Sequence, residues 1–259
     1  MRSTFRLIAL FIKLNLQKDF IYRFNGLFYL ITSLVYIGTF ILALQFILGK
    51  IPSIRGFGYD QLFVILMLGQ LWWFGISILV RKNFSHLGEA INRGTLDMYL
   101  VKPIKIRLVT PFLQFDFKHV PPAVVVLILL STKINISVLS VWQILGAIIY
   151  FLNGIFIIYS IVSLFTSFSF WVGRNNAIFD ILIELPDLVK LPLEFFPAFL
   201  QGVFIFVFPI ALMINPTFQI IYGKTDAFLL IWALVVSFGL CLLSEVIWRQ
   251  GLKRYVSAN

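Results

Sequence analysis

Residues 26–48 read GLFYLITSLVYIGTFILALQFIL, a run without a single charged side chain. A helix of this length is sufficient to cross a hydrocarbon core of about 30 Å. Segments 61–80, 141–171 and 227–247 are equally apolar, and Glu245 is the only charged residue in them. These four segments predict membrane-spanning helices, so we expect an all-α integral membrane protein.

Two further segments, 108–131 and 196–214, are apolar but contain prolines. Interrupted spans are tolerated where neighbouring helices or water satisfy the freed backbone groups. Counting both predicts a single transmembrane domain over residues 1–259 with six membrane spans.

The positive charges predict the orientation. All but four of the 21 Lys and Arg residues fall on one side of a six-span chain, with Arg174 and Lys190 assigned to the loop after span four. The positive-inside rule assigns the richer side to the cytoplasm. We therefore expect both termini in the cytoplasm and a multi-pass protein of a bacterial cytoplasmic (inner) membrane.

Composition excludes other classes. Hydrophobic residues make up 60% of the chain and charged residues 12%, about half the charged fraction of a soluble domain. The net charge of +10 comes from residues that flank the spans, which favours the headgroups of a lipid bilayer over nucleic acid as the partner. Cys241 is the only cysteine, so intrachain disulfides and cysteine clusters for zinc are excluded, and no metal site is expected.

Residues 1–25 predict an amphipathic helix in the cytoplasmic interface. Apolar side chains recur at helical spacing beside a basic strip that includes Arg6 and Lys13. We expect the chain to turn into span one at Asn25 and Gly26. The alternative is a simple extension of span one into the headgroups.

The segment 173–197 carries four acids among apolar residues: Asp180, Glu184, Asp187 and Glu194. Helical spacing places the first three on one face, which predicts an interfacial helix near the cytoplasmic surface. A set of proton-relay carboxylates is the alternative, because acids at membrane depth are usually functional.

The cytoplasmic segment 81–107 is long and charged. Glu89 and Arg93 are four residues apart in the favourable order for an ion pair, and Gly94 can end a helix in a left-handed conformation. With Pro103 closing a second short helix, the pattern predicts a compact helix–turn–helix knob below spans two and three.

The run Arg93-Gly-Thr-Leu-Asp-Met-Tyr-Leu-Val-Lys-Pro103 resembles the coupling loop of ABC-2 type exporter permeases. The basic N-terminus, the six spans and the proline-bearing fifth span extend the resemblance over the whole chain. It implies the transmembrane subunit of an ATP-binding cassette exporter, whose inward loop sits in a cleft of a separate cytoplasmic ATPase subunit. The implied contacts with the ATPase are Glu89, Arg93, Gly94, Leu96, Asp97 and Pro103. An ordinary interfacial helix with an ion pair and caps is the alternative for these residues.

The resemblance also implies short re-entrant helices after span five, matching Pro209 to Tyr222. Pro209, Asn215 and Pro216 would interrupt the helix and form an outer gate. The alternative for the same residues is a proline-kinked span followed by a loop. If spans two and five line the pathway, as in the family, then Trp72, Trp73 and Phe74 favour an apolar or amphipathic substrate.

Chemistry by this chain itself is not expected. It contains no GxxxxGK[ST] and no HExxH motif. We expect no catalytic residue and no cofactor of its own, with ATP and Mg²⁺ held by the partner ATPase. A second permease, identical or paralogous, is expected as a further partner. The alternatives are a nucleotide-independent membrane channel or scaffold and, less well supported, a lipid-modifying membrane enzyme.

Overall fold

The computed structural model describes residues 2–21, 23–101, 106–172 and 190–255. Every regular element within these ranges is a helix, apart from the isolated bridge between Ile54 and Phe57. The all-α fold class is therefore confirmed. Four described helices are long and apolar enough to cross a membrane, and the number rises to five if one bent pair counts as a span. The prediction of six spans is not confirmed.

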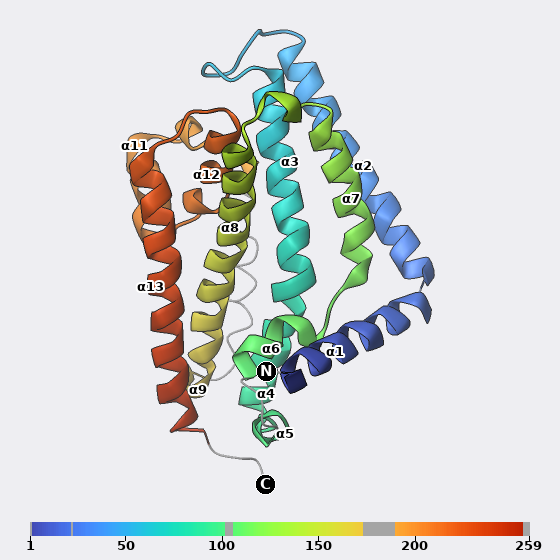
Figure 1. The fold of residues 1–259 in the computed structure, drawn as a ribbon, viewed down its shortest axis with the longest axis vertical. Coiled ribbons are helices and arrows are strands. Elements are labelled where there is room, and N and C mark those ends of the chain that lie inside the picture. Colours follow the sequence, from blue (N-terminus) through green and yellow to red (C-terminus); the bar gives the residue numbers. More distant parts are fainter. Residues whose placement is uncertain (1, 22, 102–105, 173–189, 256–259) are drawn as a thin grey trace.

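Four long helices coincide with the four apolar segments. They are α2 (Arg23–Leu48), α3 (Tyr59–Ile76), α8 (Val141–Ser167) and α13 (Ala227–Leu252). Figure 1 shows them running along the molecule, with α8 between α3 and α13, and with α2 diverging from α3. We call the end that carries residues 49–58 the apical end, and the end that carries residues 248–255 the basal end.

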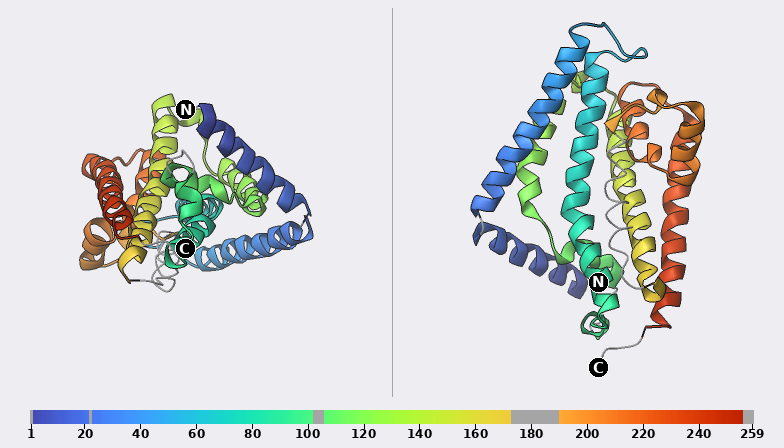
Figure 2. Two further views of the ribbon diagram at one scale, coloured as in Figure 1. Left: turned by 90° about the horizontal axis from the view of Figure 1, so that it is seen from below. Right: turned by 180° about the vertical axis from the view of Figure 1, so that it is seen from behind.

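The N-terminal helix α1 (Arg2–Ile21) lies across the basal end at a steep angle to α2 (Figures 1 and 2). It is thus a separate helix, as predicted, and not an extension of span one. The turn comes earlier than expected, because Asn25 and Gly26 lie within α2. The side chain of Asn15 donates to the carbonyl of Leu113 at 3.0 Å, and Asp19 accepts from the amide of Phe117 at 2.9 Å. Part of the polar face of α1 is therefore bound to the chain itself.

The predicted span 108–131 is divided into three pieces: α6 (Ile106–Leu113), the 3₁₀ turn η2 (Phe117–His119) and α7 (Val120–Ser131). A buried polar group explains the break. The carboxylate of Asp116 lies 3.5 Å from the ammonium of Lys82 and 3.4 Å from that of Lys118. Grouping these charges around one carboxylate is incompatible with a continuous apolar helix. The apolar helix that remains, Phe117–Ser131, is shorter than a membrane span.

The predicted span 196–214 is also divided, into α11 (Ala198–Gly202), the π-helical turn η6 (Val203–Val207) and α12 (Ala211–Ile221), with a bend of 106°. Pro209 lies at the bend and forces Phe208 into an extended conformation (φ −114°, ψ 94°). The expectation that Asn215 and Pro216 also interrupt the helix is wrong, because both lie within α12. Asn215 is buried and accepts from the amide of Leu193 at 3.4 Å.

Residues 190–197 do not lie at the basal end. The ammonium of Lys190 is 3.4 Å from the hydroxyl of Tyr36, midway along α2, and the carbonyl of Glu194 accepts from Arg55 in the apical loop at 2.7 Å. The prediction that Lys190 and Glu194 lie at the same surface as the segment 81–107 is therefore wrong. Tertiary contacts with α2 and the apical loop decide their position. Arg174, Asp180, Glu184 and Asp187 lie outside the described residues.

Both flanks of the bent pair meet the same apical residue. The ring of Phe57 lies 5.6 Å from that of Phe195, in the 3₁₀ turn η5 (Leu193–Phe195), and 6.2 Å from that of Phe218 in α12. The hydroxyl of Tyr222, just after α12, donates to the carbonyl of Asp60 at 3.3 Å. The chain therefore enters and leaves this pair of helices at the apical end.

Candidate functional site

The segment that resembles a coupling loop forms a helical knob at the basal end (Figure 1). It consists of α4 (Lys82–Asn92), a turn over residues 93–96, and α5 (Asp97–Leu100). Through the π-helical turn η1 (Ser77–Arg81), α4 continues directly from α3, so one helix of 34 residues runs from Tyr59 to Asn92. A force applied to the knob is therefore transmitted along a membrane-length helix without an intervening loop.

The turn of the knob is the one that Gly94 predicts. Gly94 has a φ of +66°, and its amide donates to the carbonyl of Ile91 at 3.2 Å. The amide of Thr95 donates to the carbonyl of Ala90 at 3.0 Å. Together these two bonds form a Schellman motif, which satisfies the last carbonyls of α4. The predicted ion pair is also present, with the Arg93 guanidinium 3.8 Å from the Glu89 carboxylate.

The outer surface of the knob is apolar at its tip. Val101 is 84% exposed and Met98 65% exposed, with Leu100 also exposed beside them. Isolated exposed apolar side chains are normal on a soluble surface, but three together on a protruding element form a patch suited to a partner. Glu89 and Arg93 belong to the same knob, and Asp97, the residue before Met98, is half-buried. These three apolar residues could not be singled out from the sequence, because apolar side chains at such spacing occur in any short helix.

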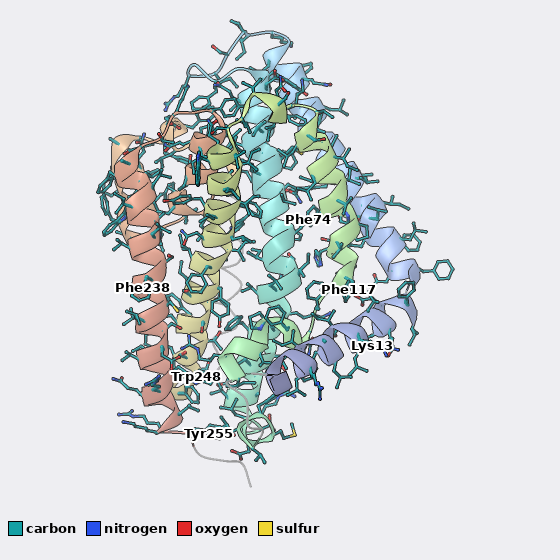
Figure 3. All side chains as sticks on the ribbon, viewed as in Figure 1. Lys13, Phe74, Phe117, Phe238, Trp248 and Tyr255 are labelled. Carbon is teal, nitrogen blue, oxygen red and sulfur yellow. The ribbon has the colours of Figure 1, made fainter. Side chains whose placement is uncertain are left out.

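The resemblance implies that Leu96 contacts the ATPase, but the structure places Leu96 inside this chain. Its side chain is fully buried, so it faces the core of this chain and not a partner. Its amide donates to the hydroxyl of Tyr255 at 3.0 Å. Tyr255 packs edge-on against Phe170, which packs against Trp248 of α13 at 5.2 Å. Figure 3 labels Trp248 and Tyr255 at the basal end. The turn of the knob is thus fastened to the C-terminal end of the chain. Pro103 lies outside the described residues.

A single buried side chain fastens the base of the knob to α6. Asn83 is 1% exposed, and its amide nitrogen donates to the carbonyls of Leu79, Pro111 and Gln114 at 3.0–3.2 Å. Its oxygen accepts from the amide of Gln114 at 2.7 Å. The amide nitrogen and the amide oxygen of Asn83 therefore both help to hold the broken backbone beside α4.

Arg107 connects α6 to the two helices on the other side of the basal end. Its guanidinium lies 2.6 Å from the carboxylate of Glu245 in α13 and donates to the hydroxyl of Ser163 in α8 at 2.6 Å. It also donates to Ser244, and its carbonyl accepts from Tyr159 at 2.8 Å. Any displacement of α6 with the knob must therefore move α8 and α13 or break this network. Glu245 was the available signal in the sequence, since an acid inside an apolar run is seldom without a partner.

The aromatic triplet of α3 is mostly inside the chain. Trp72 and Phe74 are at most 1% exposed, whereas Trp73 is partly exposed. The ring centres of Trp73 and His119 are 5.7 Å apart. Of the three, only Trp73 retains partial exposure on the molecular surface. Their role in a transport pathway stays a prediction. Among the described residues, no three His, Cys, Asp or Glu side chains gather as a metal ion requires.

A model of the family described as ABC-2 family transporter protein matches residues 34–259, which include the knob, its supports and the bent pair. The chain belongs to the ABC-2 transporter family. No curated protein and no solved structure matches it. As an ABC-2 family member it is a multi-pass membrane protein and a permease of an ABC transporter. The helix α1 lies outside the matched residues.

Proposed function

We propose that this permease is the transmembrane subunit of an ATP-driven exporter, whose knob docks into a cleft of a separate ABC ATPase subunit. The observation that carries the proposal is the continuous helix from Tyr59 to Asn92, which ends in a fastened turn beneath an exposed apolar tip. A rigid link between a docking surface and a membrane span is what conversion of ATPase closure into movement requires.

In this proposal the basal end faces the cytoplasm, and ATP and Mg²⁺ are bound by the partner alone. ATP-driven closure of two ATPase subunits displaces the knobs of two permeases, which are copies or paralogues of one another. The Asn83 and Arg107 contacts then carry the displacement to α6, α8 and α13. By linkage, a substrate that prefers one permease state shifts the affinity of the ATPase for nucleotide.

The bent pair of α11 and α12 supplies a candidate outer gate. Its two flanks return to Phe57 at the apical end, which supports the interpretation that the pair is re-entrant and not a crossing. If α11 and α12 separate, the gate opens and an apolar or amphipathic substrate can leave at the outer surface. Trp73, with its aromatic neighbours in α3, is the residue we expect to border the route.

The test is purification of the complex from its own membrane, followed by identification of stoichiometric partners and measurement of ATP hydrolysis. Val101→Asp should remove the ATPase while insertion into the membrane is unchanged. Val138→Asp is the matched control. Val138 is 76% exposed in the connection between α7 and α8, so this variant should retain the ATPase. Charge reversal by Glu89→Lys or Asp97→Lys should uncouple export in the same way.

A nucleotide-independent channel or scaffold makes the opposite prediction. Such a protein would purify without an ATPase, and Val101→Asp would leave the set of co-purifying proteins unchanged. That result would overturn the proposed exporter function.

A further inference from the structure

A crevice of about 320 Å³ lies in the elbow where α1 meets α2, at the basal end of the molecule. Figures 1 and 2 show these two helices diverging at a steep angle. The 3₁₀ turn η2 contacts both of them on the inside of that angle. The floor of the crevice is apolar and is lined by Leu16, Phe20, Leu27, Leu30, Phe117 and Pro121.

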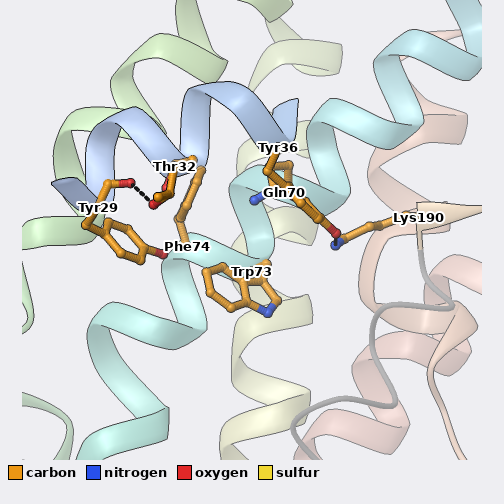
Figure 4. A pocket seen from close by; sticks show the side chains of 8 residues that line it. Tyr29, Thr32, Tyr36, Gln70, Trp73, Phe74 and Lys190 are labelled. Carbon is orange, nitrogen blue, oxygen red and sulfur yellow. Dashed lines mark hydrogen bonds between the residues drawn. The ribbon is translucent and has the colours of Figure 1, made fainter. Parts of the chain in front are cut away.

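The elbow is held together by direct contacts. The carboxylate of Asp19 accepts from the amide of Phe117 at 2.9 Å, which joins α1 to η2. On the side of α2, the ring centre of Tyr29 lies 5.3 Å from the ammonium of Lys118 and 4.6 Å from the ring centre of His119. Figure 4 shows Tyr29 directed from α2 toward α3. Elements that contact one another therefore bound the crevice on three sides.

The wall of the crevice carries two opposite charges. Lys118 and Asp19 both line it, together with the amide of Asn25. The ammonium of Lys118 lies 3.4 Å from the carboxylate of Asp116, and it has three N–H donors. The carboxylate of Asp19 can accept more hydrogen bonds than the one from Phe117. The wall can therefore bind an anionic and a cationic group at the same time.

The mouth of the crevice is surrounded by exposed apolar side chains. Phe20 is 71% exposed and Ile21 77% exposed at the end of α1, and Leu27 is 52% exposed in the first turns of α2. Apolar residues gathered at a surface in this way indicate a contact with lipid or with a partner. Because α1 crosses the basal end of a membrane span, the mouth opens at the level where lipid headgroups meet acyl chains.

The size and the charges define the ligand. A volume of about 320 Å³ is at the lower limit of the roughly 300–1,000 Å³ of small-molecule sites, so it accommodates a headgroup and its glycerol. The acyl chains would lie outside, along the face of α2 that presents Leu27, Ile31 and Val35. A headgroup with one phosphate and one ammonium complements Lys118 and Asp19 together.

We propose that the elbow crevice binds one molecule of an aminophospholipid of the phosphatidylethanolamine type, taken from the leaflet at the basal end. Its phosphate contacts Lys118 and its ammonium contacts Asp19. The bound lipid joins α1 to η2, and Asp116 connects Lys118 to Lys82 at the start of the knob. The inference does not depend on the proposed exporter function, because the site uses none of the surfaces that contact the ATPase.

The experiment measures binding of four probes to the full chain, delipidated and purified in neutral detergent, by native mass spectrometry and by thermal shift. The probes are dioctanoyl-phosphatidylethanolamine, dioctanoyl-phosphatidylglycerol, dioctanoylglycerol and phosphoethanolamine. The first should bind about tenfold more tightly than each of the others. Equal binding of dioctanoylglycerol would overturn recognition of the headgroup. Equal or tighter binding of phosphatidylglycerol would overturn the role of Asp19, and equal binding of phosphoethanolamine would overturn the assignment to a lipid.

A matched pair of glycine variants locates the site. Gly26 lines the crevice, and an added Cβ atom there meets no atom within 4 Å. Gly26→Leu should therefore fill the crevice without disturbing the helix and weaken phosphatidylethanolamine binding about tenfold. Gly38→Leu makes the same change in α2, where an added Cβ atom also meets nothing within 4 Å, and should leave binding unchanged. If both variants bind like the unmodified chain, the crevice is not the site.

A second matched pair tests the carboxylate. Asp19→Asn removes the charge but keeps an oxygen that can accept from the amide of Phe117, so the elbow should stay intact. This variant should lose the preference for phosphatidylethanolamine over phosphatidylglycerol. Asp226 at the apical end accepts from the amide of Phe228 at the same distance of 2.9 Å, and Asp226→Asn should retain the preference. A preference that persists in Asp19→Asn would contradict the contact between Asp19 and the lipid ammonium.

Discussion

The backbone amide of Leu96 donates a hydrogen bond of 3.0 Å to the hydroxyl of Tyr255, although 159 positions separate the two residues. One lies in the turn of the knob and the other near the end of the chain. The position of the knob therefore depends on the C-terminal segment as well as on the helix that carries it.

Tyr255→Phe removes this bond and keeps the ring contacts with Phe170. The loss should cost about 1 kcal/mol, the usual net value of one such hydrogen bond. Amide hydrogen exchange at residues 95–97 should become faster. Tyr222→Phe is the control, because it removes a similar hydroxyl-to-backbone bond at the apical end and should leave exchange in the knob unchanged.

Gly94→Ala should destabilise the knob by about 1–2 kcal/mol, because its φ of +66° is unfavourable for a residue with a Cβ atom. Hydrogen exchange across the turn reports the local effect. Gly38→Ala is the control in α2, where nothing lies within 4 Å of the added carbon, and it should be neutral or slightly stabilising. Equal behaviour of the two variants would contradict the left-handed turn.

Gly154→Ala should disrupt the packing of α12 against α8. The added Cβ would lie 2.0 Å from the carbonyl oxygen of Met213, and a backbone atom cannot move aside as a side chain can. We expect a loss of about 1–3 kcal/mol, measured as a lower midpoint of thermal unfolding. Gly146→Ala lies in the same helix and faces Ile220 of the same partner at 3.5 Å, so it should be tolerated.

The Arg107–Glu245 pair should behave as a coupled unit. Glu245→Gln removes the charged partner of a buried guanidinium and should cost about 1.5–3 kcal/mol. The double variant with Arg107→Met should cost less than the sum of the single changes, since no unpaired charge remains. Arg249 is the other partner of Glu245, and its side chain is 74% exposed. Arg249→Met should therefore cost under about 1 kcal/mol. Additive single and double changes in a double-mutant cycle would show that the pair does not act together.

The long apolar helices and the knob could be predicted because their signals are local. The four apolar segments form four long helices, and Gly94 with the Glu89–Arg93 spacing predicted the turn and ion pair that the structure contains. Each of these depends on residues within a few positions of one another, so the sequence alone carries the information.

The two proline-bearing segments were less predictable. Span 108–131 is divided because Asp116 gathers cations from η2 and from α4, a contact that hydropathy does not record. In the predicted re-entrant segment 209–222 only one of three suspected helix breakers interrupts the helix. Pro209 does so, whereas Pro216 is accommodated within α12.

The sequence by itself determined that this chain is an all-α membrane protein with a basal knob, since helix formation and burial in lipid follow from local composition and periodicity. Only the tertiary structure decided that Leu96 is an anchor, that Arg107 connects α6 to α13, and that Lys190 lies beside Tyr36, midway along α2. These positions depend on contacts between residues far apart in the chain. The interactions that stabilise these positions involve partner residues that no local sequence pattern specifies.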